Sequence, residues 1–298
     1  MKWTLALLLI AAVGSEGLAV YVGWNLTHPA RKAVTVAPDK LGLTFEPVTF
    51  QSREDGLRID GWFLPASGAP SDRTVILAHG FRGNRQDTGP GLLTVAKVLV
   101  ENGYNALLFD FRASGSSAGD EVTVGWKETR DLAGAVDYVR SRGARKVALV
   151  GFSMGAATSL MTAAELPEVD AVVADSSFGA LGPYLLENAR HWTKLPDFPF
   201  TYLIYATVPR MLGVSLDGVS PIKAMGALAD RPVLLIHGTG DTAIDVHHSK
   251  DLFAAYQAHG GKQGELVLVP GAGHTGSYKA ATDLYKEKLL GFLGQHLR

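Results

Sequence analysis

The chain has 298 residues, of which 47% are hydrophobic, and it contains no Cys. Its length and apolar content are enough for a substantial core, and it lacks the long polar tracts of disordered proteins. A formal net charge of −1 gives no reason to expect nucleic-acid binding, and the absence of Cys excludes disulfides, thiol catalysis and Cys-ligated zinc.

Residues 1–24 form an apolar segment that predicts export or membrane anchoring. As a signal peptide, Leu5 to Val13 is the hydrophobic region, and cleavage falls near Gly14. As an anchor, Trp3 to Trp24 is long enough to span a bilayer, which takes about 20 residues. A third interpretation is an apolar helix packed on the domain. Because hydrophobicity resumes after Glu16, we expect the uncleaved anchor, although an acid in mid-membrane costs about 2–3 kcal/mol.

The charges that flank this segment do not fix its orientation, because Lys2 lies on one side and Arg31-Lys32 on the other. Residues 25–43 show no clear periodicity and are expected to be a connector. We expect one domain over residues 44–298.

This domain begins with two segments that roughly alternate apolar and polar residues, Phe45–Ser52 and Leu57–Leu64. The turn between them contains Asp55-Gly56, a dipeptide that is frequent in tight hairpins. The pattern predicts an antiparallel hairpin at a sheet edge.

From Thr74 onward, apolar strand-like runs alternate with helical periodicity. Strands are expected at residues 74–79, 104–110, 146–150, 169–175, 231–237 and 265–270, and helices at 91–101, 126–141, 156–164, 247–259 and 278–297. This alternation predicts an α/β fold with a mostly parallel sheet and helices on both faces. Ligands of such sheets bind at the carboxyl ends of the strands.

Residues 178–229, here called the cap segment, interrupt the alternation. Tyr184–Trp192 and Phe198–Leu212 are largely apolar and helical in character, and Pro196 and Pro199 separate them. An insertion after a strand end is well placed to cover a ligand site. We therefore expect a small helical cap that lines the pocket; the alternative is that part of the segment forms ordinary core helices.

Gly151-Phe-Ser-Met-Gly155 joins an expected strand to an expected helix. This context is typical of a nucleophile elbow, in which the Ser lies at the tip of a strained turn and the glycines avoid collisions. A plain Gly-rich turn is the alternative. Ser153 is thus the candidate nucleophile if the chain also supplies its partners.

A serine hydroxyl needs a general base, and nine histidines are available. His274 lies in the Gly-rich loop after the last strand, from which an imidazole can reach another strand end. His79 and His237 each end a strand, where we expect them to hold loops by hydrogen bonds. A helix that is expected at the surface carries His247, His248 and His259. We predict His274 as the base.

The base in turn needs an acid that fixes its tautomer. Asp241 follows the preceding strand and would place a carboxylate beside His274. Asp245 lies near a helix start, where capping is the simpler role. Asp175 ends the strand after the elbow and could also reach the histidine. We predict Asp241, with Asp175 as the rival.

An oxyanion needs hydrogen-bond donors, which the backbone can supply. One donor is the N–H of Met154, the residue after the candidate nucleophile. The second is expected from the loop after the first parallel strand, where Gly80 lets the chain turn and the N–H of Phe81 is the best placed.

Together these motifs resemble the α/β-hydrolase superfamily. The matching segments are His79-Gly-Phe81, Asp110-Phe-Arg-Ala-Ser-Gly-Ser-Ser117, Gly151-Phe-Ser-Met-Gly155, His237-Gly-Thr-Gly-Asp241 and Gly273-His274, in the expected order over residues 45–298. Within the superfamily the chain is similar to bacterial membrane-anchored hydrolases of the prolyl-oligopeptidase-like and serine-aminopeptidase-like groups. This resemblance implies a place in the bacterial cell envelope. One departure is Ala113, where many members have Gly.

We therefore expect a serine hydrolase that cleaves the carboxylic ester of a small-molecule acyl substrate through an acyl-enzyme, without a metal or organic cofactor. Aminopeptidases, thioesterases and acyltransferases use the same constellation, and a non-catalytic binding scaffold is the alternative from another class. An aminopeptidase would need a carboxylate in the cap segment for the substrate amine. The candidates there are Glu187, Asp197 and Asp217.

Overall fold

The computed structural model describes residues 2–87 and 89–298. Within these residues, eight strands form one sheet in the order β1-β2-β4-β3-β5-β6-β7-β8. The strands are β1 (Glu46–Gln51), β2 (Arg58–Leu64), β3 (Arg73–Ala78), β4 (Asn105–Phe109), β5 (Lys146–Phe152), β6 (Ala171–Asp175), β7 (Val233–Gly238) and β8 (Gly264–Val269). β2 is antiparallel to β1 and to β4, and all other neighbours are parallel. The predicted edge hairpin and the mostly parallel sheet are both confirmed.

The central strands are apolar on both faces because both faces are covered. In β3, Ile76 and Ala78 pack into one core, here called the first core, and Val75 and Leu77 pack into the core on the opposite face, here called the second core. Alternate residues of a strand point to opposite faces, so a strand between two helical layers needs apolar residues at successive positions. This is why these strands read as continuous apolar runs.

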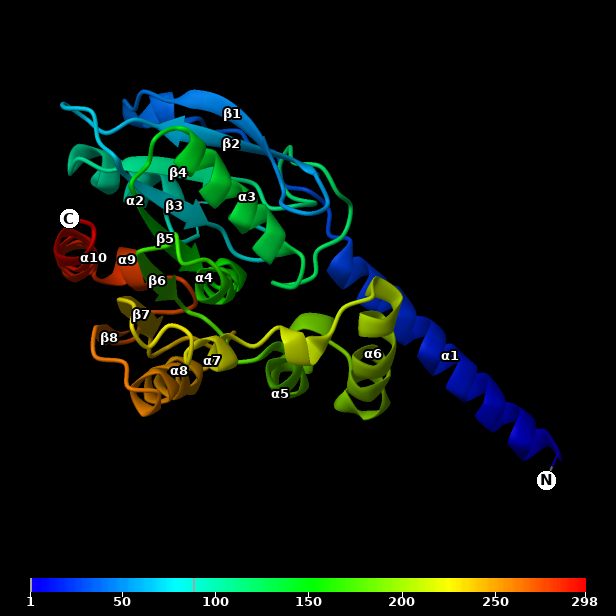
Figure 1. Ribbon diagram of the computed structural model, residues 1–298. Coiled ribbons are helices and arrows are strands. Elements are labelled where there is room, and N and C mark those ends of the chain that lie inside the picture. Colours follow the sequence, from blue (N-terminus) through cyan, green and yellow to red (C-terminus); the bar gives the residue numbers. More distant parts are fainter. Residues whose placement is uncertain (1, 88) are drawn as a thin grey trace.

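Helices cover the sheet as two layers (Figure 1). One layer contains α3 (Glu128–Ser141), α4 (Met154–Glu165) and α8 (His247–Ala258), and the other contains α2 (Leu92–Glu101), α9 (Ser277–Ala280) and α10 (Thr282–His296). The single C-terminal helix expected at residues 278–297 is wrong, since Ala281 has φ −142° and ψ 61° and separates α9 from α10. The break turns the chain so that Tyr285 and Leu289 are buried in the second core.

The turn after β4 contains the departure from the resemblance noted in the sequence. Ala113 has φ 55°, in the left-handed region that glycine adopts without strain. Its methyl group is buried among the apolar side chains of the first core. The position therefore has the backbone geometry that favours Gly, and packing of the methyl group offsets part of the strain.

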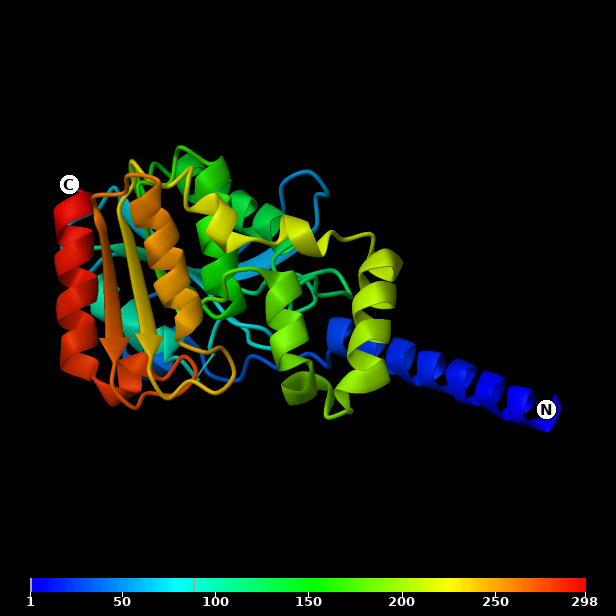
Figure 2. The ribbon, with the colours of Figure 1, turned by 90° about the horizontal axis from the view of Figure 1, so that it is seen from below.

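The cap segment lies between β6 and β7 in the chain. It contains α5 (Leu181–Thr193), α6 (Asp197–Leu212), the short 3₁₀ helix η2 (Leu216–Gly218) and α7 (Pro221–Ala224). The two helices predicted on either side of Pro196 are thus present. Figure 2 shows α5 and α6 set apart from the sheet, on the side toward the N-terminal helix.

The N-terminal segment is one helix, α1 (Lys2–Thr27), which projects away from the sheet (Figure 1). Its buried residues are Ala19, Gly23 and Thr27, which are four apart and share one face. Among the residues described, α1 is the helix that is long and apolar enough to cross a membrane. The connector after it includes a 3₁₀ helix, η1 (Pro38–Leu41).

Candidate active site

Ser153 lies at a strained turn between β5 and α4. Its backbone has φ 55° and ψ −119°, a conformation that costs a non-glycine residue about 1–3 kcal/mol. A Cβ added at Gly151 would lie 2.2 Å from the Gly155 carbonyl oxygen, and one at Gly155 would lie 2.2 Å from that of Ala78. The turn is therefore so tight that both flanking positions require glycine, as the elbow motif predicts.

Three of the predicted site residues meet at the carboxyl ends of the strands. His274, in the loop after β8, lies with its Nε2 2.8 Å from Ser153 Oγ. Its Nδ1 lies 2.7 Å from Asp241 Oδ2, in the loop after β7. A carboxylate can only accept, so His274 Nδ1 carries the ring proton and donates it to Asp241 Oδ2; the lone pair of the neutral ring is then on Nε2 and faces the serine hydroxyl. This arrangement can take a proton from Ser153.

The Asp241 carboxylate is held by four donors. Its Oδ1 accepts the N–H groups of Ala243 and Ile244, each at 2.9 Å. Its Oδ2 faces His274 and lies 3.3 Å from His237 Nε2. Burial by itself would raise the pKa of Asp241, but the hydrogen bonds from His237 and His274 outweigh it and hold that pKa well below its usual range. The carboxylate thus stays ionised beside the imidazole.

The two rival acids have other partners. Asp175 accepts a hydrogen bond from Ser176 Oγ at 2.9 Å, and its Oδ2 has no partner among the described residues. Asp245 accepts the N–H of His247 at 2.8 Å, as the predicted capping role requires. The geometry therefore brings Asp241 to His274, and leaves Asp175 as a buried acid beneath the site.

Asp175→Asn is expected to stabilise the protein at neutral pH, because burial raises the pKa of Asp175 to about 6 against the opposing hydrogen bond from Ser176. The native state keeps this proton where the unfolded chain, with an Asp pKa of about 3.9, has lost it. Ionisation of Asp175 alone therefore lowers the free energy of unfolding of the wild type by about 3 kcal/mol as the pH rises from about 4 to about 6, and this contribution stays lost above that.

Asn cannot ionise and avoids this loss. The test compares the free energy of unfolding of Asp175→Asn and wild type in detergent at acidic and at neutral pH. From acidic to neutral pH, the free energy of unfolding of Asp175→Asn should rise by about 3 kcal/mol relative to that of the wild type. A difference that stays constant over the range would mean that Asp175 ionises normally.

His79 and His237 hold loops by hydrogen bonds, as predicted. His79 Nδ1 donates to the Gly80 carbonyl at 2.7 Å, and its Nε2 accepts the Phe111 N–H at 3.0 Å. His237 Nε2 donates to the Ile244 carbonyl at 2.9 Å, which shapes the loop that carries Asp241. The contact between His237 and Asp241 was not anticipated from the sequence, although the two are only four residues apart.

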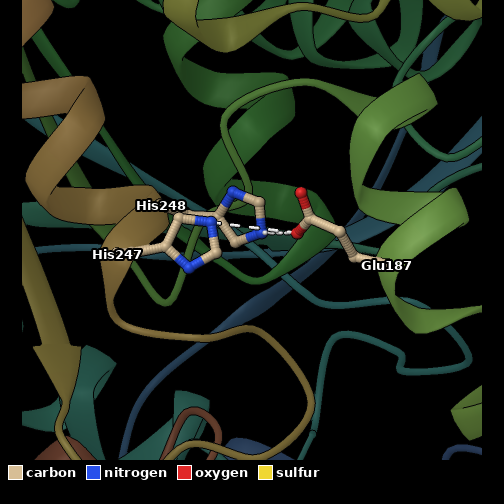
Figure 3. A group of neighbouring side chains, drawn as sticks. All are labelled: Glu187, His247 and His248. Atoms are coloured by element: carbon tan, nitrogen blue, oxygen red, sulfur yellow. Dashed lines mark ion pairs between the residues drawn. The ribbon is translucent and has the colours of Figure 1, made fainter.

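The prediction that His247, His248 and His259 all lie at the surface is wrong for His248, which is buried where α5 packs against α8. Figure 3 shows its ring and that of His247 pointing toward Glu187 of α5. The Nε2 atoms lie 3.4 Å (His248) and 3.8 Å (His247) from Glu187 Oε2. Gly179, Tyr184 and Glu187 of the cap segment all contact His248, so this segment covers that end of α8.

The ligand atoms of Glu187, His247 and His248 lie within 4.8 Å of one another, which is close enough to hold a metal ion. The Gly179 N–H, however, donates to His248 Nδ1 at 3.3 Å. The proton of the neutral ring is then on Nε2, the atom that faces Glu187. Nε2 therefore has no lone pair to offer a metal ion. The geometry favours a polar contact between the cap segment and α8 over a cation site.

The predicted oxyanion donors flank Ser153. A Cβ added at Gly80 would lie 3.3 Å from Ser153 Cβ, so the turn after β3 passes close to the serine. The hydrogen bonds of turns and loops in the described residues include none donated by the Phe81 or Met154 N–H. Both residues line the same cavity as Ser153. Their N–H groups are therefore available to an oxyanion there.

A cavity lies over Ser153, between the strand ends, the cap segment and α1. No charged side chain of the described residues lines it. The apolar and aromatic residues that line it include Phe178, Leu181, Tyr184, Trp192, Ile204, Tyr205, Val208 and Leu212. Gly23, Leu26 and Thr27 of α1 also line it, which was not anticipated. The four-residue spacing of small residues on α1 is the sequence signal for such a helix contact.

The chain is similar to known proteins over most of its length. A profile of the prolyl oligopeptidase family matches residues 92–298. The uncharacterized protein YfhR of Escherichia coli K12 is 28% identical over 262 residues, 83% of this chain and 80% of YfhR. A solved structure of the esterase Pf2001 of Pyrococcus furiosus has a TM-score of 0.75 at 26% identity and covers 91% of this chain and 100% of that one. With its sheet and its helical layers, the chain is a serine hydrolase of the α/β-hydrolase fold and belongs to the prolyl oligopeptidase family.

Proposed function

We propose that the chain is an esterase in which Ser153, His274 and Asp241 form the catalytic triad. The observation that carries this proposal is the hydrogen-bonded series from Asp241 through His274 to Ser153, with distances of 2.7 and 2.8 Å. The series ends at a cavity that is lined by no charged side chain of residues 2–87 and 89–298. Similarity to the esterase Pf2001 supports the same reaction class.

The reaction proceeds in two halves. Ser153 Oγ bonds to the carbonyl carbon of the ester while its proton moves to His274 Nε2, and the N–H groups of Phe81 and Met154 hold the oxyanion. The bond to the alcohol oxygen then breaks, and His274 returns the proton to the departing alkoxide. Water enters, gives a proton to His274 and bonds to the acyl carbon. The bond from that carbon to Ser153 Oγ then breaks, His274 returns the proton to Oγ, and the acid leaves.

The cavity favours an ester over the amine-bearing substrate of an aminopeptidase. Such a substrate needs a carboxylate partner, and none of the candidates in the cap segment lines the cavity. Glu187 faces His247 and His248, and Asp197 accepts a hydrogen bond from Thr201. An ammonium group in an uncharged cavity would lose its hydration without a compensating partner.

We also propose that α1 remains attached and anchors the enzyme in the membrane of a bacterial cell envelope. The last turn of α1 is joined to the domain, since the Thr27 carbonyl accepts the Val122 N–H at 2.7 Å. The exposed first half of the helix carries large apolar side chains, such as Leu5 and Ile10, which are more than half exposed. A bilayer removes that surface from water.

Labelling with a fluorophosphonate, which reacts with activated serine hydroxyls, tests the triad. The wild type should be labelled, and Ser153→Ala should not be. Ser159→Ala is the matched control, because Ser159 is also buried, in the adjacent helix, and its hydroxyl bonds only to the Gly155 carbonyl. Label that persists in Ser153→Ala would move the nucleophile elsewhere, and an unlabelled wild type would end the esterase proposal.

A further inference from the structure

The helix proposed as the membrane anchor forms part of the wall of the cavity over Ser153. Gly23, Leu26 and Thr27 lie in its last turns, and they line the same space as the serine. A separate anchor would need no contact with the cavity. The space that reaches the candidate nucleophile thus extends to the helix that would lie in the bilayer.

The cap segment follows α1 toward the membrane. α6 lies alongside α1 in both views (Figures 1 and 2). A Cβ added at Gly23 would lie 2.1 Å from Val208 Cγ2, so glycine permits this close approach. Thr207 Oγ1 donates to Glu16 Oε1 at 2.8 Å. Because Glu16 lies midway along α1, α6 reaches the depth of the membrane segment and gives its half-buried acid a partner.

The cap segment exposes several large apolar side chains at its surface. Phe198 is 80% exposed and Tyr202 is 63% exposed, both on α6. Met211 of α6 and Leu186 of α5 are nearly half exposed. Side chains of this kind beside an apolar helix are expected at a membrane interface, where apolar rings and chains leave the water.

We propose that the cap segment lies in the bilayer surface and that the substrate is an ester with a long acyl chain, which passes from the membrane into the cavity. This proposal rests on the proposed esterase function and adds the substrate class. The uncharged walls fit a hydrocarbon chain, and the oxygen atoms of the ester then meet Ser153 and the oxyanion donors. The bilayer is the occupant of the apolar surface because α1, which continues that surface, needs the same apolar surroundings.

The test uses the full chain in vesicles of dialkyl-ether phosphatidylcholine, which contain no carboxylic ester. The probes are 4-methylumbelliferyl palmitate and butyrate, whose leaving groups are identical, so the ratio of their kcat/KM values reports the acyl chain alone. Leu26→Trp fills the part of the cavity next to α1 and should lower the palmitate-to-butyrate ratio by about tenfold or more. Leu9→Trp, on the exposed part of the same helix, should leave the ratio unchanged.

A second pair of variants tests the membrane surface without touching the cavity wall. Phe198→Asp with Tyr202→Asp places two charges on the proposed interface and should lower the same ratio. Gln257→Asp with Gln295→Asp adds the same charge on exposed positions of α8 and α10 and should not. Because all four positions are exposed, these variants are expected to fold.

The outcomes separate this proposal from the esterase function itself. The membrane-substrate proposal alone would be overturned by a wild type that hydrolyses butyrate but not palmitate. It would also be overturned if Leu26→Trp and the Phe198→Asp, Tyr202→Asp variant both kept the palmitate-to-butyrate ratio of the wild type. A wild type that hydrolyses neither probe and takes no fluorophosphonate label would overturn both. A falling ratio in both test variants, with both controls unchanged, supports the proposal.

Discussion

Asp241→Asn is expected to lower ester turnover by about 10⁴-fold while the chain stays folded. The Asn side chain keeps an oxygen for the Ala243 and Ile244 N–H groups, which Asp241 Oδ1 accepts at 2.9 Å. Its amide group, however, would face His274 Nδ1, which now lies 2.7 Å from the carboxylate. The amide donates, so His274 Nδ1 becomes the acceptor and its Nε2 carries the proton. In that tautomer the ring cannot take the proton of Ser153.

The measurement is kcat with a butyrate ester, together with thermal unfolding to show that the fold is intact. Asp175→Asn is the matched control, because it is the same substitution at the neighbouring strand end and Asp175 bonds to Ser176, not to His274. It should reduce turnover by less than about tenfold. Equal losses in the two variants, or a larger loss in Asp175→Asn, would assign the orienting acid to Asp175.

Arg112→Met should destabilise the fold by about 3–5 kcal/mol, because it leaves a buried carboxylate without its counter-charge. The Arg112 side chain is 3% exposed and donates to Asp131, which is completely buried, at 2.7 to 3.2 Å. It also bonds to Ser52 Oγ and pairs with Asp55. Through these contacts, Arg112 joins the turn after β4 to α3 and to the turn of the hairpin.

Chemical unfolding in detergent measures the effect. Two further variants are compared with Arg112→Met, one as a control and one in which stability should partly return. Arg145→Met is the control, since Arg145 is 84% exposed and 4.0 Å from Asp72, and should change stability by less than about 0.5 kcal/mol. Adding Asp131→Asn to Arg112→Met removes the uncompensated charge and keeps an acceptor for the backbone N–H of residue 112, which bonds to Asp131 Oδ2 at 2.9 Å in the wild type, so stability should partly return. A loss in Arg112→Met no larger than in Arg145→Met would show that the pair contributes little.

Local patterns in the sequence were enough to predict the sheet, its parallel core and the elbow at Ser153. The reason is that strand and helix periodicity, and the close packing that demands Gly151 and Gly155, involve neighbours in the chain. The order of loops along the chain also placed His274 and Asp241 at strand ends. These features depend on backbone geometry that each short segment largely sets for itself.

Only the tertiary structure separated Asp241 from Asp175 as the partner of His274. Asp175 ends β6 and Asp241 lies in the loop after the neighbouring strand β7, so the sequence puts both within reach, and the path of that loop decides which carboxylate meets the imidazole. The burial of His248 is similar, because its exposure depends on α5, a helix far away in the chain. In each case the deciding contact is made by residues that sequence spacing does not relate.

The same limit applies most strongly to α1. Its composition alone predicts a membrane segment, and hydrophobicity is a property that the sequence fixes residue by residue. That Gly23 lies against Val208, and that Leu26 lines the cavity over Ser153, follows from how two helices pack across the fold. Packing partners are chosen by the shape of the whole domain, and so the sequence determined a long apolar helix while the tertiary structure decided that this helix is also a wall of the candidate active site.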